Sequence, residues 1–298
     1  MLAEAEQARR DAESAKAEAQ KAQTALEAAV HQAREEAAEA LAEEAMARPA
    51  AATLPRSSAA PRRPEETLCV DLEAGLKSVQ GWRGDSISIR TFADAIDIAC
   101  VIGGTDPAAP ADGFFSEAHH RYLSETYPDL ALRIAGKRII FVDSITDLTR
   151  QAMAWAKTRP EAFSEKTGKP DTRGAYGLLA RETISLLKHL QHAPGKTVVF
   201  VGILERVVDD FNREQWQPQM EGGKAGRELP GIVDQVISMS LFEPDVDGWR
   251  HEPAKGQVRR LVCRAGNPFG LPAKDRSGRL EVTEPADLGA LLAKINRI

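Results

Sequence analysis

The sequence predicts an α/β fold with a largely parallel central sheet for the part of the chain that follows residue 66. Short apolar runs alternate there with longer stretches of helical periodicity. The runs at 137–143 and 197–204 are apolar between polar ends, as in strands that are covered on both faces. Buried strands separated by amphipathic helices are typical of layered α/β proteins.

The elements are expected in a regular order along this part of the chain. Strands are predicted at 67–72, 86–90, 137–143, 197–204, 234–241 and 259–264, with an edge strand at 280–283. Helices are predicted at 93–102, 116–127, 146–157, 175–192 and 285–295. The stretch 103–113 is rich in Gly, Pro and Asp, which predicts a loop.

The N-terminal 66 residues have a different composition. Residues 1–47 are almost all Ala, Glu, Gln, Lys and Arg, which predicts one long helix. Its narrow apolar stripe fits either a weak coiled-coil seam or a solvated single helix. Residues 48–66 hold four prolines and four arginines, and we expect a linker that is either solvated or in contact with nucleic acid. The predicted domains are therefore 1–47, 48–66 and 67–298.

Composition bounds the class of protein. The chain has 298 residues, of which 43% are hydrophobic and 28% charged, as in a globular protein with a sizeable core. A net charge of −5 argues against a basic coat for nucleic acid but allows a local basic groove. Cys69, Cys100 and Cys263 lack metal-site spacing, so reduced thiols in a cytoplasmic protein are expected. The sequence shows neither a long apolar span nor a signal peptide, so no membrane partner is expected.

The strongest chemical signal is the run Arg138-Ile-Ile-Phe-Val-Asp143-Ser144. The carboxyl ends of strands in a parallel sheet face the ligand crevice. A carboxylate at Asp143 is therefore well placed to hold Mg²⁺ through water. The alternative is an ordinary buried strand whose last residues cap the helix that follows.

A second acidic strand end lies at Thr67-Leu-Cys-Val-Asp71-Leu-Glu73-Ala-Gly75. Asp71 and Glu73 have the same parity along the strand, so their side chains are expected on one side. Glu73 is a candidate for polarising an attacking water beside a Mg²⁺ site. The alternative is a solvated acid in a loop.

The order of these motifs resembles that of RecA-like ATPases. More closely, Asp71-Leu-Glu73-Ala-Gly75-Leu76 and Ile140-Phe-Val-Asp143-Ser144 resemble phage-type AAA/RecA-like ATP-binding proteins of recombination, from about residue 67 to the C-terminus. The resemblance implies a RecA-like three-layer sandwich, ATP and Mg²⁺ as ligands, and ATP hydrolysis in DNA recombination or replication. It implies Glu73 as the catalytic base, and Asp143 with Ser144 as the Walker B site. Glu205 is the candidate for sensing the γ-phosphate.

Two later segments fit the same resemblance. The Gly-rich, basic stretch 217–231 resembles the mobile DNA-facing loop of recombinases, with Lys224 and Arg227 as DNA contacts and Trp216 as a base-stacking residue. The segment Lys274-Asp-Arg276-Ser-Gly is similar to the Lys-Asn-Arg-x-Gly element of RadA-type relatives, whose basic residues reach a neighbouring subunit's phosphates. The alternatives are an ordinary surface loop and a solvated turn. Single-stranded DNA and further copies of the chain are the implied partners.

The phosphate-binding loop of such enzymes is not visible in the sequence. It requires Gly-x-x-x-x-Gly-Lys-[Ser/Thr] between a strand and a helix. The linker 48–66 stands where the loop is expected, and it contains no Gly and no Lys. Gly195-Lys196-Thr197 has Leu190 in the place of the first glycine and opens a strand, so we reject it.

The loss of this loop has consequences for fold and function. The missing strand is expected beside the Asp143 strand, and its loss predicts unpaired strand edges there. Two explanations stay open. One is a genuine fusion or a degenerate, non-hydrolysing member, and the other is a shifted reading frame or misplaced start for about the first 65 residues. The two functional hypotheses are an ATPase and a catalytically inactive RecA-like DNA- or protein-binding module with a coiled-coil arm.

Overall fold

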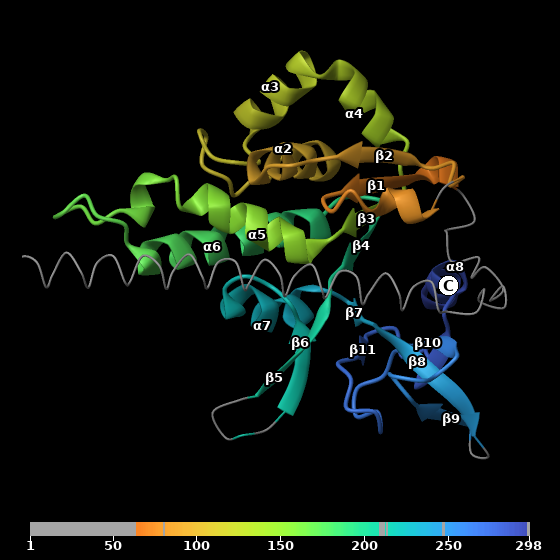
Figure 1. Cartoon of the computed structure of the whole chain (residues 1–298). Coiled ribbons are helices and arrows are strands. Elements are labelled where there is room, and N and C mark those ends of the chain that lie inside the picture. Colours follow the sequence, from red (N-terminus) through yellow and green to blue (C-terminus); the bar gives the residue numbers. More distant parts are fainter. Residues whose placement is uncertain (1–63, 80, 209–211, 213, 246–247, 297–298) are drawn as a thin grey trace, which may run out of the picture. The chain divides into compact units, whose positions relative to one another are not determined.

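The computed structural model describes residues 64–296 except 80, 209–211, 213 and 246–247 (Figure 1). Contacts divide the chain after residue 56, and all described residues belong to the unit 57–298. The predicted long helix at 1–47 lies outside the described residues. So does the predicted linker 48–66, apart from a short 3₁₀ turn, η1 (Pro64–Glu66).

A four-stranded parallel sheet organises the first part of this unit, as the sequence predicts. Its strands are β1 (Thr67–Asp71), β2 (Asp85–Ser88), β3 (Ile139–Asp143) and β4 (Thr197–Val201). Their order in the sheet is β2-β1-β3-β4, and all neighbours are parallel. The register places Asp71 beside Asp143 and Asp143 beside Val201, so three strands end at one level.

One face of this sheet carries a layer of helices. The main helices of this layer are α2 (Phe92–Gly103), α5 (Ile145–Ala156) and α6 (Thr172–Gln191), and they share one apolar core with the strands. Helices α3 (Glu117–Thr126) and α4 (Pro128–Ala135) pack on α2. Val70, Ile140 and Val142 face this core, so alternate residues such as Phe141 face the other way. The second helical layer of a three-layer sandwich is not found among the described residues.

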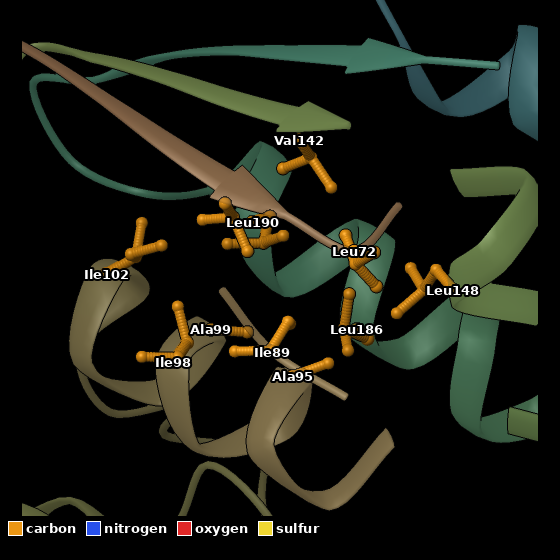
Figure 2. A pocket seen from close by; sticks show the side chains of 11 residues that line it. Leu72, Ile89, Ala95, Ile98, Ala99, Ile102, Val142, Leu148, Leu186 and Leu190 are labelled. Atoms are coloured by element: carbon orange, nitrogen blue, oxygen red, sulfur yellow. The ribbon is translucent and has the colours of Figure 1, made fainter. Parts of the chain in front are cut away.

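A small apolar cavity of about 20 Å³ lies within this core. Figure 2 shows side chains of β1, β3, α2, α5 and α6 around it. A space of this size holds about one water, and a wall of aliphatic side chains stays dry. The cavity is therefore a packing defect and not a ligand site.

The open edge of the parallel sheet is not where the sequence analysis expects it. Strand β3 has a neighbour on each side, so the prediction of an unpaired edge beside Asp143 is wrong. Among the described residues the outer edge of β4, like that of β2, has no strand partner. Its sequence, TVVFV, carries no charge or proline, and all five residues are only partly buried. Natural edge strands are usually protected by such residues, so the edge of β4 lacks the usual protection against pairing with a further strand.

The segment after β4 differs from its prediction. The expected strand 197–204 ends at Val201, and a hairpin of β5 (Leu204–Val208) and β6 (Glu214–Pro218) follows. The stretch 217–231 is not a flexible loop, because it contains helix α7 (Gly223–Ile232). Ala225, Leu229 and Ile232 are buried at helical spacing, and this apolar face outweighs the glycines.

The C-terminal strands form a separate, antiparallel sheet. Its order is β12-β10-β8-β9, and a two-stranded pair, β11-β7, accompanies it. The bounds are β7 (Gln235–Val236), β8 (Ser238–Asp245), β9 (Gly248–His251), β10 (Val258–Val262), β11 (Lys274–Asp275) and β12 (Thr283–Pro285). Helix α8 (Leu288–Ile295) packs on this sheet through Leu291, which meets Leu261 and Leu280. Every helix in the described part of the chain is too short or too polar to span a membrane.

Candidate functional site

Two carboxylates lie side by side at the carboxyl edge of the parallel sheet. Asp71 and Asp143 end β1 and β3 and are register partners, so their side chains point to the same face. Asp71 is only 4% exposed, and its Oδ1 accepts a hydrogen bond of 3.2 Å from the backbone N–H of Gly75. The sequence predicts an acid at each of these strand ends, and the structure adds that the two strands are neighbours.

The carboxylate of Asp143 has fewer hydrogen-bond donors than that of Asp71. Burial raises the pKa of its carboxyl, and the charges of Asp71 and Asp147 raise the pKa further. No hydrogen-bond donor within the described residues reaches this carboxylate. A half-buried carboxylate that lacks a donor is stabilised when a cation binds beside it.

Ser144 links the two acidic strand ends. Its hydroxyl donates a hydrogen bond to Oε1 of Glu73. The same oxygen lies 3.4 Å from the backbone N–H of Asp147 and caps the N-terminus of α5. The helix cap and the contact with Glu73 are therefore compatible, because one hydroxyl makes both.

Glu73 lies in the exposed turn that follows β1, where Ala74 has a positive φ of 58°. The hydrogen bond from Ser144 lowers the pKa of Glu73. Burial, the neighbouring Asp147 carboxyl and the charge of Asp143 raise the pKa of Glu73. Together they outweigh the hydrogen bond, so the pKa lies above its ordinary value. A carboxylate with a raised pKa is a better proton acceptor at neutral pH. The geometry thus gives Glu73 a fixed direction and a basicity that suit proton transfer.

The acidic edge fits a Mg²⁺ ion held mainly through water. Within the described residues, no group of three or more His, Cys, Asp or Glu side chains is arranged to hold a metal ion. Mg²⁺ commonly keeps several waters and uses one or two carboxylates together with phosphate oxygens of the substrate. The uncompensated carboxylate of Asp143 supplies a ligand of that kind.

Helix α5 ties this edge to the exit of β4 through two threonines. Thr146 Oγ1 accepts a hydrogen bond of 3.1 Å from the N–H of Ile203, and Thr149 Oγ1 accepts one of 3.0 Å from the N–H of Glu221. Sequence reasoning missed both residues. The available signal was two threonines three residues apart in a helix that follows directly on Ser144. They hold the chain after β4 against α5.

The predicted phosphate-sensing residue lies on the hairpin that follows β4 and has a partner there. Glu205 is on β5, four residues past the end of β4, and its Oε1 accepts a hydrogen bond of 3.0 Å from Gln217. The tip of β4 itself is Gly202, where a Cβ would lie 3.0 Å from the side chain of Ile145. At the end of β4, only the backbone of Gly202 therefore lies next to the acidic edge, and this backbone packs closely on α5.

The predicted basic residues divide into separate environments. Lys274 points inward, and its Nζ donates to the carbonyls of Pro230 at 2.6 Å and Val233 at 2.7 Å. Arg276 forms a 2.8 Å ion pair with Asp234. Lys224, Arg227 and Trp216 lie on α7 and β6, as exposed side chains. Among the described residues, no hydrogen bond or ion pair joins any of these side chains to the acidic edge.

The rejected Gly195-Lys196-Thr197 segment has a structural role. As predicted, Thr197 opens a strand, β4. The Nζ of Lys196 donates to the carbonyls of Ile134 at 3.1 Å and Lys137 at 2.8 Å, and burial lowers its pKa. Lys196 therefore binds backbone at the amino edge of the sheet, far along the strands from Asp143.

Comparison with known proteins identifies a family for this chain. A family model described as an AAA domain matches residues 56–277, which is more than half of the chain. The matched range includes both acidic strand ends, helix α7 and strand β11. No curated protein and no solved structure matches the chain significantly.

Proposed function

The chain belongs to the AAA domain family, and on that premise we propose that it binds ATP and hydrolyses it at the acidic edge of the parallel sheet. Membership of the family indicates a nucleotide-binding, ATPase-like function. The observation that carries the finer proposal is the carboxylate of Asp143. It is half-buried, has Asp71 as its register partner and is followed by a serine that orients Glu73.

The roles of the residues follow from their positions. Glu73, oriented by the Ser144 hydroxyl, accepts a proton from water as the water oxygen bonds to the γ-phosphorus. The bond between the γ-phosphorus and the β–γ bridging oxygen breaks in the same step, and ADP and phosphate leave. Mg²⁺ at Asp143 would offset the charge of the phosphate oxygens. Asp71, held by the N–H of Gly75, would offer a second carboxylate near that ion.

The resemblance to recombination proteins extends this proposal to partners. We propose single-stranded DNA as a partner, further copies of the chain as neighbours, and phage DNA recombination or replication as the setting. Exposed Arg276 is the better candidate for reaching a neighbouring subunit's phosphates, because Lys274 is already engaged by two backbone carbonyls. Lys224, Arg227 and Trp216 remain the proposed DNA contacts, and Glu205 remains the proposed phosphate sensor.

A specific observation favours a second candidate function. The sequence contains no Gly-x-x-x-x-Gly-Lys-[Ser/Thr] motif, and this motif supplies the backbone donors that cradle phosphates. Without an equivalent cradle, the chain would be a RecA-like module that binds DNA or protein and does not hydrolyse ATP. The open edge of β4 is the place where a further strand with such a loop can attach.

Binding of a fluorescent ATP analogue to the full chain, with and without Mg²⁺, separates the two candidates. The ATPase proposal expects Mg²⁺-dependent binding that Asp143→Ala abolishes. The matched control is Glu125→Gln, which removes an exposed acid on α3 and should bind like the wild type. Absence of binding by a well-folded wild-type sample would contradict the ATPase proposal and favour the inactive module.

A further inference from the structure

A second candidate site lies where α6 and α7 end. A hollow of about 590 Å³ opens between the last turn of α6, helix α7 and the residue after β11. We call it the basic hollow. Its lining residues are Lys188, Gln191, His192, Arg227, Glu228, Gly231, Ile232 and Arg276.

The fold separates the basic hollow from the acidic edge. Helix α7 runs beside α6 in the same direction, because Gly222 lies against Leu179 and Ile232 shares the hollow with Gln191. The end of α6 leads into the amino end of β4, whereas Asp143 stands at the carboxyl end of β3. The two sites are therefore at opposite edges of the parallel sheet.

The charges of the basic hollow are only partly compensated. Glu228 is the one acid among its described lining residues and is 3.9 Å from Lys224, and Arg276 is paired with Asp234. Lys188 has no hydrogen-bond or ion-pair partner within the described residues. Arg227 uses only its Nε, which donates to the carbonyl of Gly223 at 3.1 Å. Two cationic groups thus remain available in a chain whose net charge is −5.

The side chains that line the basic hollow favour a ligand with several linked phosphate groups. A guanidinium and an ammonium on neighbouring helices suit phosphate oxygens, and Gln191 and His192 add neutral polar groups. A water occupies about 30 Å³ in the liquid, so the hollow has room for roughly twenty waters and for more than one phosphate. The described lining residues include no Phe, Tyr or Trp, so they offer no platform for stacking a base.

We propose that the basic hollow binds the phosphate backbone of a single-stranded nucleic acid, with Lys188 and Arg227 as the principal contacts. The proposal rests on the DNA partner of the proposed function and gives that partner a site on the chain. Contact through the backbone alone makes the binding independent of base sequence and dependent on salt.

The test is fluorescence anisotropy of a labelled single-stranded oligonucleotide with the full chain, over a series of salt concentrations. For single strands, log K against log salt falls with a slope of about 0.7 per phosphate contact. Loss of two contacts in Lys188→Gln/Arg227→Gln should lower the slope by about 1.4 and the affinity at 0.1 M salt by about 25-fold. Lys188→Gln alone removes no hydrogen bond or ion pair between described residues. It should lower the affinity for the oligonucleotide about fivefold at 0.1 M salt.

Arg121→Gln/Lys166→Gln is the matched control, because it removes the same charge from exposed residues outside the hollow. Thermal melts check that all variants are folded. The proposal is overturned if the hollow variants and the control bind alike, or if the wild type binds no oligonucleotide. It is also overturned if inorganic phosphate or ATP occupies the hollow in preference to the oligonucleotide.

The same samples distinguish this proposal from the ATPase proposal. Asp143→Ala should keep its affinity for the oligonucleotide, since Asp143 lies at the other edge of the sheet. Lys188→Gln should keep its affinity for the ATP analogue. Loss of analogue binding with retained oligonucleotide binding contradicts only the ATPase proposal, and the reverse result contradicts only the basic hollow.

Discussion

Replacing Asp143 by asparagine should stabilise the protein while removing its proposed ion ligand. Asp143 and Asp71 are register partners on neighbouring strands, which are about 4.8 Å apart. Two unit charges about 5 Å apart repel by about 3 kcal/mol at an effective dielectric constant of about 20 and by about 0.8 kcal/mol in water. Asp143 is half-buried, so a gain of about 1–2 kcal/mol in the free energy of unfolding is expected for Asp143→Asn at pH 7.

The sign of this effect follows from the pKa. The pKa of Asp143 in the folded protein is raised above its ordinary value of 3.8. Its ionisation therefore disfavours the folded state as pH rises through the folded pKa. The advantage of Asp143→Asn should be full near pH 7 and should shrink as pH falls toward 4.

Urea unfolding followed by tryptophan fluorescence at both pH values measures the difference. Glu125→Gln is the control, and an exposed substitution of this kind should change stability by no more than about 0.5 kcal/mol. Equal or lower stability of Asp143→Asn at pH 7 would refute the reasoning, because it would mean that the carboxylate is compensated in the folded protein.

Three further predictions concern the packing around the sheet. His189 is 8% exposed and stacked on Phe115, and burial lowers its pKa below 6.5. Wild-type stability should therefore fall relative to His189→Leu as pH drops from 7 to 5, measured by urea unfolding. Gly103→Ala would place a Cβ 2.5 Å from His189 Nε2, so a loss of about 1–3 kcal/mol is expected in the same assay. Thr146→Val leaves the N–H of Ile203 without its acceptor, which should lower the free energy of unfolding by about 1 kcal/mol. Thr146→Ser keeps a hydroxyl acceptor and should retain most of this stability.

Sequence patterns predicted the parallel sheet because its signals are local. The apolar runs before Asp71 and Asp143 are too short for helices but long enough for strands. Each run ends in an acid, and the two acids lie at the same edge of the sheet. The sequence predicts Ser144 as a site residue or as a helix cap; its hydroxyl caps α5 and donates to Glu73, and its role at a nucleotide site stays a prediction. The family match over 56–277 supports the AAA-type domain that these motifs predicted.

Other features depend on contacts between distant residues and could not be predicted. The sequence predicts a loop in place of helix α7, because the glycines of this segment conceal the spacing of Ala225, Leu229 and Ile232. The identity of the open edge depends on β3 pairing with both β1 and β4, which no single segment encodes. The basic hollow joins Lys188 to Arg276 across separate elements, so only the fold brings them together.

The most direct test of the central claim is single-turnover ATP hydrolysis by the full chain, with phosphate release as the readout and analogue binding measured on the same samples. Loss of a general base typically lowers the rate by about 10²–10⁴-fold. We predict that Glu73→Gln retains Mg²⁺-dependent binding and loses hydrolysis by at least about 100-fold, while Glu125→Gln hydrolyses like the wild type. Equal rates for Glu73→Gln and wild type, or no hydrolysis by wild-type protein that binds the analogue, would contradict the account.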